Sequence, residues 1–365
     1  MNNCDLCQIC LIENKKHQAK LKEIWKFNYY TMSSDSIFEN FNTLTALVIG
    51  DVMIDSYLWG KVERISPEAP VPVVSLKNRE SRLGGAANVA LNLKSLGAKT
   101  IMCSVVGNDT ESQTLIQMFE EQNIDVRGII HSQVRPTTIK HRILAGSQHL
   151  LRIDSETTTS ISETESNQLI NQVKELALEA DVIIFEDYDK GVLTEKVISE
   201  LIDFANQKNI PTVIDPKKRN FWHYKNATLF KPNLKELEEG LGRDIDVKNT
   251  TLNTLSESEI AIAVEELAQK MQLKSVLITL SEYGVYIANS SENHKIAAHK
   301  REISDVSGAG DTVVSIAGLC MALKLPLKTV AELANLGGGL VCESLGVVPI
   351  DKSLFKQEAK KKITI

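Results

Sequence analysis

The sequence predicts an α/β protein built on a doubly wound, mostly parallel sheet with helices on both faces and a small β lid. From Ala46 onward, short apolar runs alternate with amphipathic stretches of helical length, which is the pattern of a parallel sheet covered by helices. Two other stretches, near 56–76 and 136–154, have the pattern of strands with no helix within them. We expect these two stretches to form a small sheet over a cleft, where it would exclude water.

The elements of the main body follow from these runs. Five apolar runs are predicted to be strands, at 46–50, 100–107, 181–185, 211–215 and 275–280. The amphipathic stretches predict helices, which include 86–96, 110–122, 163–179, 194–208 and 257–271. The expected organisation is an N-terminal extension over 1–43, poorly ordered at least to residue 31, one domain over 44–355 and a C-terminal tail over 356–365.

Composition and charge narrow the class of protein. Of the 365 residues, 43% are hydrophobic and 24% are charged, which is the balance of an ordinary globular protein. No apolar run reaches the roughly 18 residues of a transmembrane helix, and no signal-peptide core is present, so we expect a cytoplasmic protein. The formal net charge of -6 argues against nucleic acid or an anionic membrane as partner. We therefore expect small-molecule partners.

The six cysteines fall into two groups. Cys103, Cys320 and Cys342 lie in apolar surroundings and are interpreted as reduced core thiols. The other three form the segment CDLCQIC at 4–10, which has the short spacing of a metal-binding loop but no fourth cysteine nearby. The alternative is that this segment belongs to an extension without a metal, and that Met32 opens the part leading into the first strand.

The segment DVSGAGD, at 305–311, runs directly into a helix-length apolar stretch. The small residues Gly308, Ala309 and Gly310 leave backbone N–H groups accessible at a helix N-terminus, where unpaired donors and the helix dipole favour an anion. The carboxylate of Asp311 follows at once and could accept the proton of an attacking hydroxyl. The alternative is a glycine-rich helix entry that Asp311 merely caps.

DVSGAGD resembles the DTxGAGD signature of the ribokinase-like PfkB carbohydrate kinase family, with Ser307 in place of the usual threonine. GGAANVALNLKSLGA, at 84–98, resembles the N-terminal glycine motif of the same family. The resemblance covers about residues 44–350 and implies a ribokinase-like fold and an ATP-dependent phosphotransferase that acts on an alcohol group. It makes Asp311 the catalytic base and the Gly-Ala-Gly before it the anion hole. It also implies Mg²⁺ as a cofactor with ATP, and leaves a dependence on a monovalent cation open.

KPNLKELE, at 231–238, resembles the Asn-x-x-Glu element of the family. The resemblance places Asn233, Leu234, Lys235 and Glu236 near the ATP phosphates, with Glu236 holding Mg²⁺ through water, since Mg²⁺ keeps several waters and needs few direct carboxylates. Taken alone, an Asn and a Glu at this spacing are more often a helix N-cap and its capping-box partner. Two weaker matches around the nucleotide are Thr279 and Asn335.

The same resemblance implies a set of residues on the sugar side. Their glycines would let the backbone approach the sugar, their acids and amides would read its hydroxyls, and their cations would hold a phosphate. The set is Asp55, Gly84, Gly85, Asn88, Lys140, Arg142, Arg152, Asp154 and Asp187. The alternatives are a tight turn at the glycines and solvated surface charges at the lid cations. We expect a homodimer that forms through the β lid.

Longer strings resemble kinases that phosphorylate heptose 7-phosphate at the anomeric hydroxyl. They are GDVMIDSYLWGKVERISPEAPVPVV, RPTTIKHRIL, QHLLRID and FEDYDKGVL. The implied reaction converts D-glycero-D-manno-heptose 7-phosphate to the 1,7-bisphosphate, for ADP-heptose, lipopolysaccharide and other surface glycans. Related two-part enzymes carry a nucleotidyltransferase domain after the kinase, and here we expect the kinase part alone, with a separate nucleotidyltransferase in the cell.

Three alternatives remain from the sequence. The first is the same chemistry on ribose, fructose or a hexose phosphate, and the second is a sugar- or nucleotide-binding regulator without catalysis. The presence of Asp311, Asn233 and Glu236 argues against the second. The third is a dinucleotide-binding oxidoreductase, because ALVIGDV at 46–52 opens like a Rossmann strand, but no G-x-G-x-x-G follows it.

Overall fold

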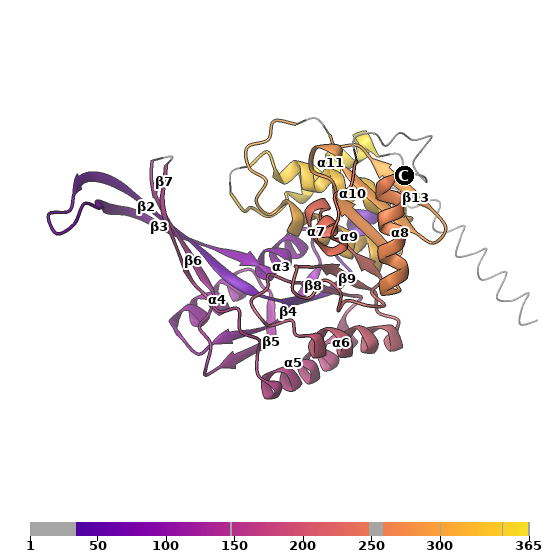
Figure 1. Ribbon diagram of the computed structural model, residues 1–365, viewed down its shortest axis with the longest axis horizontal. Helices are drawn as coiled ribbons and strands as arrows, with labels where there is room; N and C mark the ends of the chain where they lie inside the picture. The colour runs from indigo at the N-terminus through magenta and orange to yellow at the C-terminus, as the bar shows by residue number, and fades with distance from the viewer. Residues whose placement is uncertain (1–33, 147, 248–257, 300, 345, 364–365) are drawn as a thin grey trace, which may run out of the picture.

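A computed structural model describes residues 34–146, 148–247, 258–299, 301–344 and 346–363 (Figure 1). The main sheet has nine strands in the order β13-β12-β11-β10-β9-β8-β1-β4-β5. It is parallel from β5 to β11, and β12 and β13 continue it antiparallel. The strands are β1 (Thr45–Gly50), β4 (Lys99–Gly107), β5 (Asp125–Ser132), β8 (Val182–Glu186), β9 (Thr212–Asp215), β10 (Leu229–Phe230), β11 (Ser275–Thr279), β12 (Val285–Asn289) and β13 (Asn293–Ile296).

Helices cover both faces of the main sheet because its strands are apolar on both sides. Along β1, Ala46 and Val48 pack into one buried cluster, while Leu47 and Ile49 pack into the other. The first cluster includes residues of α3 (Ala86–Ser95), α4 (Thr110–Glu121), α9 (Ala309–Ala322) and α10 (Leu327–Val341). The second includes residues of α5 (Glu163–Leu176), α6 (Glu195–Lys208), α7 (Leu234–Leu241) and α8 (Glu259–Met271). The predicted doubly wound α/β body is confirmed.

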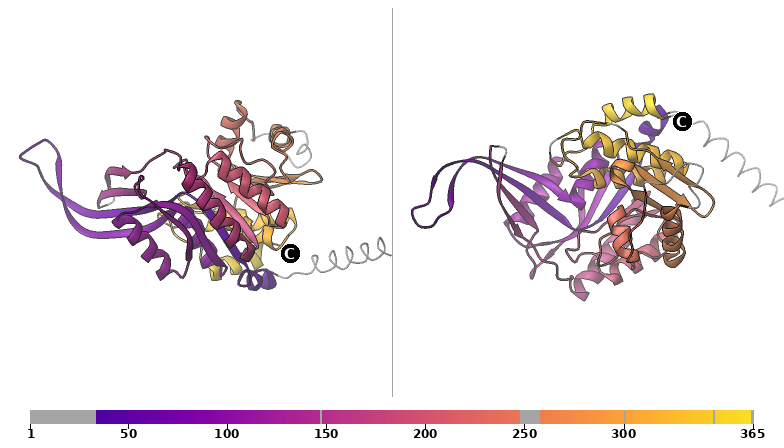
Figure 2. Two further views of the ribbon diagram at one scale, coloured as in Figure 1. Left: turned by 90° about the horizontal axis from the view of Figure 1, so that it is seen from below. Right: turned by 45° about the horizontal axis from the view of Figure 1, so that its top comes forward.

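A second sheet of four strands forms an arm that projects from this body (Figures 1 and 2). Its order is β3-β2-β6-β7, and only β2 and β6 are parallel neighbours. The strands are β2 (Val52–Ile65), β3 (Pro72–Gly85), β6 (Ile139–Ala145) and β7 (Gln148–Ser155). The predicted lid sheet is therefore present, and β2 and β3 reach further than the expected 56–76. The long β3 ends at Gly85, immediately before α3, so the lid and the body share this junction.

The packed body also includes residues outside the expected limits at 43 and 355. Helix α2 (Ser34–Phe41) buries Phe38, whose ring lies edge-on to Phe355 of α11 (Lys352–Lys362) with 5.0 Å between centroids. Asp35 also pairs with Lys356 and Lys360, at 3.1 and 2.6 Å. The two helices lie side by side (Figure 2). A buried aromatic pair thus joins the two ends of the described chain.

The remaining expectations about single residues and segments have mixed outcomes. Cys103 and Cys320 are buried free thiols as predicted, whereas Cys342 is only partly buried. CDLCQIC lies outside the described residues. Among the helices that the structure describes, none combines the length and the apolar character needed to cross a membrane.

Candidate active site

Helix α9 places Asp311 at the centre of the candidate site. The helix is almost wholly apolar along Val313–Cys320 and lies buried against β8 and β9. Its N-cap is Gly308, which has a left-handed φ of 79°, and a Cβ atom there would come within 3.1 Å of Nδ2 of Asn88. The first turn of the helix offers N–H groups that have no partner within the helix. The helix N-terminus at which the sequence predicts an anion site is therefore present.

Asp311 is buried, with 7% of its surface exposed, and two side chains hydrogen-bond to its carboxylate. Nδ2 of Asn88 donates to Oδ2 at 2.6 Å, and the Tyr188 hydroxyl donates to Oδ1 at 3.0 Å. Burial raises the pKa of Asp311 above its usual value, and the Asn88 and Tyr188 hydrogen bonds oppose this rise. The two donors thus favour the ionised form, which is the form that a general base needs.

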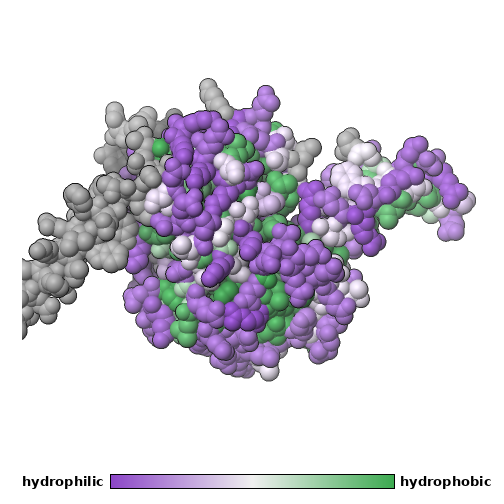
Figure 3. Space-filling model, turned by 180° about the vertical axis from the view of Figure 1, so that it is seen from behind, coloured by the Kyte–Doolittle hydropathy of each residue, from purple (hydrophilic) through white to green (hydrophobic). Residues whose placement is uncertain are grey.

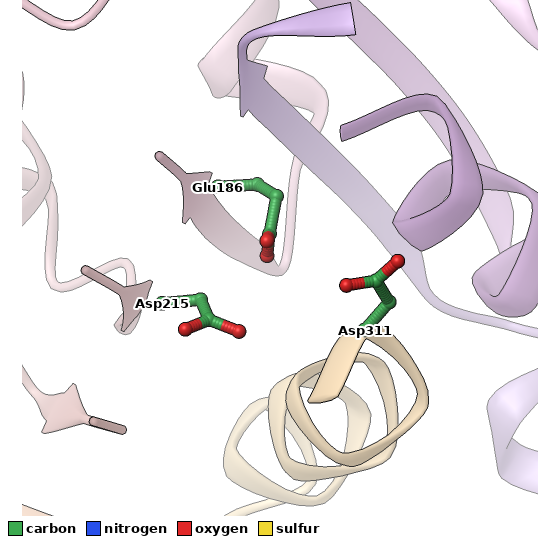
Figure 4. Close-up of side chains that lie close together, drawn as sticks. All are labelled: Glu186, Asp215 and Asp311. Atoms are coloured by element: carbon green, nitrogen blue, oxygen red, sulfur yellow. The ribbon is translucent and has the colours of Figure 1, made fainter. Parts of the chain in front are cut away.

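Two more carboxylates lie beside Asp311. Glu186 ends β8 and Asp215 ends β9, and these two residues are directly paired across the parallel strands. One oxygen of each of Glu186, Asp215 and Asp311 lies within 4.8 Å of the other two (Figure 4). Side chains at the carboxyl ends of parallel strands commonly form the ligand site of an α/β sheet. Three buried carboxyl groups therefore lie together at this edge of the sheet.

Lys231 lies next to the carboxylates and is itself buried. Its Nζ atom pairs with Oδ2 of Asp215 at 2.8 Å. Burial alone would lower the pKa of Lys231, but Asp215 and Glu236 raise it above its usual value, so the ammonium stays charged. A Cβ atom on Gly310 would lie 3.7 Å from Asp215 and 3.9 Å from Lys231. The first turn of α9 therefore faces this ion pair at close range.

The Asn-x-x-Glu element forms a capping box at the start of α7. Oδ1 of Asn233 accepts from the Glu236 N–H, and Oε2 of Glu236 accepts from the Asn233 N–H, both at 2.8 Å. Oε1 of Glu236 accepts from Lys217 at 2.7 Å. The interpretation of Asn233 and Glu236 as a helix N-cap and its capping-box partner is confirmed. Both carboxylate oxygens of Glu236 accept hydrogen bonds.

The other expected nucleotide residues surround this helix start and the neighbouring strands. Asn233 is paired with Thr279, the last residue of β11. Leu234 opens α7, and the exposed Lys235 follows it. Asn335 is on α10 and donates to the carbonyl of Ala297 at 2.8 Å.

The sugar-side residues meet where the lid joins the body. Asp55 is buried on β2 and pairs with Arg142 of β6. A Cβ atom on Gly84 would come within 2.5 Å of Oδ2 of Asp55, and Gly85 has a φ of 59°. Asn88 follows in the first turn of α3 and reaches Asp311. Glycine is required at the junction, and it brings Asp55 and Asn88 close to the catalytic loop.

The charged lid residues share one face of the small sheet. Register pairs Asp55 with Lys140, Lys140 with Asp154, and Arg142 with Arg152. Arg142 also lies over the ring of Tyr57, with 5.3 Å between the guanidinium carbon and the ring centroid. Its side chain is 22% exposed, whereas that of Arg152, on the edge strand, is 62% exposed. Arg142 is therefore the more buried of the two arginines.

Asp187, expected from the sequence on the sugar side, lies apart from the other residues of that set. It follows Glu186, so strand alternation turns it to the opposite face of the sheet. There its carboxylate accepts hydrogen bonds from the Asp189 N–H, Asn220 and Tyr224 at 2.7–2.9 Å, and it is buried. Burial, followed by the charge of Asp51, raises the pKa of Asp187 to about 6. Asp187 stabilises the loop after β8 and does not reach the sugar side.

Residues 44–352 match the pfkB family of carbohydrate kinases. The chain belongs to this family. A PfkB kinase transfers a phosphoryl group to a sugar hydroxyl, so the predicted class of enzyme is confirmed. The matched range agrees with the range of the resemblance found in the sequence.

Curated relatives of this PfkB kinase carry the name bifunctional protein HldE. The protein from Syntrophotalea carbinolica is 39% identical over 319 residues, which are 87% of this chain and 63% of that protein. Those from Magnetococcus marinus and Helicobacter pylori are 41% and 38% identical over 84% and 82% of this chain. The chain spans less than two thirds of the length of these relatives, 62–63%.

Solved structures show the same fold at lower sequence identity. Phosphofructokinase-2 from Escherichia coli, in complex with potassium, has a TM-score of 0.70 and 19% identity over 87% of this chain and 98% of its own. Ribokinase from Arabidopsis thaliana, complexed with ribose and ATP, has a TM-score of 0.64 and 16% identity over 86% and 98%. The ribokinase-like fold of this PfkB kinase is thereby established.

Four residues of this PfkB kinase site were not predicted from the sequence as site residues. They are Tyr188, Lys231, Glu186 and Asp215. Glu186 and Asp215 carried a signal, because each is an acid at the end of an apolar strand. Lys231 and Tyr188 did not stand out, since their roles depend on which strands become neighbours.

Proposed function

We propose that this kinase transfers the γ-phosphoryl group of ATP to the anomeric hydroxyl of D-glycero-D-manno-heptose 7-phosphate. The product is the 1,7-bisphosphate, a precursor of ADP-heptose for lipopolysaccharide or other surface glycans. The reaction would take place in the cytoplasm. The observation that carries the proposal is the buried Asp311, which hydrogen-bonds to Asn88 at the junction of lid and body. The HldE relatives and the longer sequence strings favour heptose as the sugar.

The proposed mechanism moves one proton and one phosphoryl group. Asp311 accepts the proton of the anomeric hydroxyl as that oxygen attacks the γ-phosphorus, and the bond to the bridging oxygen of ADP breaks in line. The N–H groups of the first turn of α9 and the ammonium of Lys231 stabilise the negative charge that spreads over the phosphoryl oxygens. Mg²⁺, when bound, supplies further neutralisation of phosphate charge.

The cations at the base of the lid are the proposed binding site for the 7-phosphate. Arg142 and Lys140 are two residues apart on β6 and share one face with Asp55. Lys190 reaches the same region, because Lys140 and Lys190 both pair with Glu156, at 3.8 and 2.6 Å. An arginine presents a planar pair of donors that matches phosphate oxygens. Arg142 is therefore our main candidate for a direct phosphate contact.

We further propose that two copies pair through the outer face of the lid. The face opposite Arg142 carries Leu151 and Ile153, which are 57% and 50% exposed in the single chain. Side chains of this size are seldom left exposed side by side without a partner. Figure 3 shows hydrophobic patches on the projecting arm between hydrophilic ones.

A substrate panel tests the proposed function. Purified kinase is supplied with ATP and Mg²⁺, and ADP release is followed with heptose 7-phosphate, ribose, fructose and fructose 6-phosphate, with and without KCl. We expect the highest kcat/KM for heptose 7-phosphate and a product phosphorylated at carbon 1. A higher value for another sugar would replace heptose in this account. An absence of ADP release with every sugar would favour a non-catalytic binding protein.

A further inference from the structure

Arg82 joins the lid to a part of the body that lies 265 residues away along the chain. It is on β3, directly opposite Asp55 of β2, so it belongs to the face of the lid that carries the sugar-side residues. Its Nη1 atom donates to the carbonyl of Val347 at 3.3 Å. A Cβ atom on Gly346 would come within 2.6 Å of the same nitrogen. The guanidinium therefore lies against residues 346–347, which we call the bridging segment.

Two neighbours within the lid fix the orientation of this guanidinium. Its Nε atom donates to Oε1 of Glu80 at 2.6 Å. Its central carbon lies 4.9 Å from the centroid of the Tyr57 ring. Because a planar guanidinium that is already held loses little freedom when it makes a further hydrogen bond, the contact with Val347 costs little entropy. Arg82 thus connects the lid to the bridging segment in a defined geometry.

The bridging segment packs in turn on the DVSGAGD loop. The Gly346 N–H donates to Oδ2 of Asp305 at 3.0 Å. Oδ1 of the same carboxylate accepts from the N–H and the hydroxyl of Ser307, at 3.0 and 2.8 Å. A Cβ atom on Gly308, the N-cap of α9, would lie 3.3 Å from Cγ1 of Val347. The bridging segment therefore contacts both the first residue of the loop and the start of the helix.

The lid face and the helix start have to be aligned for the proposed reaction. The lid face is proposed to hold the sugar, and the first turn of α9 is proposed to stabilise the phosphoryl oxygens. A misplacement of about 1 Å between reacting groups can cost about 100-fold in rate. We propose that Arg82 is a positioning residue, which acts through the bridging segment to set the N-terminus of α9 relative to the sugar-side face of the lid. The inference rests on the proposed phosphoryl transfer, whichever sugar is the acceptor.

The competing role for Arg82 is a direct contact with the phosphate of the substrate. Arg142, the main candidate for that contact, also lies over the Tyr57 ring, so Arg82 is close to the proposed phosphate site. The two roles differ in their kinetic signature. Loss of a contact that binds substrate and transition state equally raises KM and leaves kcat unchanged, whereas loss of alignment in the transition state lowers kcat.

Kinetics of Arg82→Ala and Arg82→Lys distinguish these roles, with the best acceptor of the substrate panel as the sugar. We expect kcat of Arg82→Ala to fall by about 10- to 100-fold. The KM values for ATP and for the sugar should stay within about 2-fold of the wild type. Arg82→Lys should retain more of the kcat, because its ammonium can still donate to the Val347 carbonyl.

Arg79→Ala is the matched control for these variants. Arg79 is an exposed arginine of the same strand, and its position three residues earlier places it on the opposite face of the lid. Its loss should leave kcat and both KM values at those of the wild type. Circular dichroism and thermal unfolding verify that each variant is folded.

Hydrogen–deuterium exchange supplies a readout that does not require turnover. Without Arg82 the bridging segment loses its anchor on the lid, so local opening of the neighbouring loop becomes easier. We expect amides of residues 305–312 to exchange faster in Arg82→Ala than in the wild type, and at the wild-type rate in Arg79→Ala.

Three results would overturn the inference: a wild-type kcat in Arg82→Ala, a loss confined to the KM for the sugar, or unchanged exchange over residues 305–312. The second result would make Arg82 a substrate ligand. Absence of turnover with every sugar would contradict the proposed function, and the exchange comparison would still decide whether Arg82 holds the loop.

Discussion

Nδ2 of Asn88 donates a 2.6 Å hydrogen bond to Oδ2 of Asp311, although 223 residues separate the two along the chain. This contact joins the N-terminal glycine motif to the DVSGAGD loop in one buried site. One residue lies at the junction with the lid, where the sugar is proposed to bind, and the other is the proposed base. The contact therefore links sugar binding to the ionisation of the base.

Removing either donor to Asp311 should shift the pH dependence of the reaction. Asn88 and Tyr188 both stabilise the ionised carboxylate, so Asn88→Ala or Tyr188→Phe raises the pKa of Asp311 further. The base works only when ionised, so activity is lost at a higher pH than in the wild type as the pH falls. The acid limb of the kcat profile measures this. Acid limbs in both variants that coincide with that of the wild type would exclude Asp311 as the titrating base.

Gly310→Ala should separate folding from catalysis. A Cβ atom at Gly310 meets only ordinary contacts, 3.7 and 3.9 Å from Asp215 and Lys231, and alanine favours helices by up to about 1 kcal/mol over glycine. The added methyl nevertheless occupies the space where the phosphoryl group is proposed to lie. We expect unchanged or increased thermal stability with at least about a 10-fold loss of kcat, since small misplacements cost about 100-fold. Full activity in the variant would show that the phosphoryl group passes elsewhere.

Arg142→Ala and Arg152→Ala form a matched pair on one rung of the lid sheet. A charge-assisted hydrogen bond contributes about 1.5 to 3 kcal/mol, so loss of Arg142 should lower kcat/KM for heptose 7-phosphate by about 10- to 150-fold. The KM for ATP should not change. Arg152 is 62% exposed on the edge strand, and its loss should matter much less. If neither variant loses activity, the phosphate lies elsewhere, with Lys190 and Lys217 as the next candidates.

The strands that sequence predicted well are those with an unambiguous apolar run. Residues 182–185 and 46–49 are apolar and buried on both faces of the sheet, so every residue of these runs carries the signal. β13, at Asn293–Ile296, is half-buried with polar residues, and β10 has only two residues, so neither run was recognisable. Helix α2 was missed because its stabilising partner, α11, is more than 300 residues away.

The candidate site was predictable where a local motif carries the function. Asp311, Asn233 and Asn88 lie in short glycine- or proline-containing segments whose backbone form follows from their residues. Glu186 and Asp215 lie close together only because β8 and β9 are neighbours in the sheet. No local sequence pattern predicts that strand pairing. Asp187 lies away from the other expected sugar-side residues because a one-residue step along the chain reverses the face of the sheet.

Introducing a charged side chain on the outer face of the lid tests the proposed dimer. Leu151→Glu would bury a carboxylate between two copies, which is costly without a partner, so the variant should be monomeric where the wild type is dimeric. Val134→Glu is the control, because Val134 is 85% exposed and lies outside the lid strands. Light scattering after size-exclusion chromatography gives the masses. A monomeric wild type, or a Leu151→Glu variant that stays dimeric, would remove the lid as the interface.

The kcat of Asp311→Asn, measured by ADP release with heptose 7-phosphate, tests the central claim most directly. Asparagine keeps the shape of the side chain but cannot accept the proton, and general bases contribute about 100- to 10,000-fold to rates. We expect a loss near the upper end of that range because the site is buried, with ATP affinity nearly intact. A folded variant that keeps more than about a tenth of the wild-type kcat, far above what loss of a base allows, would contradict the account.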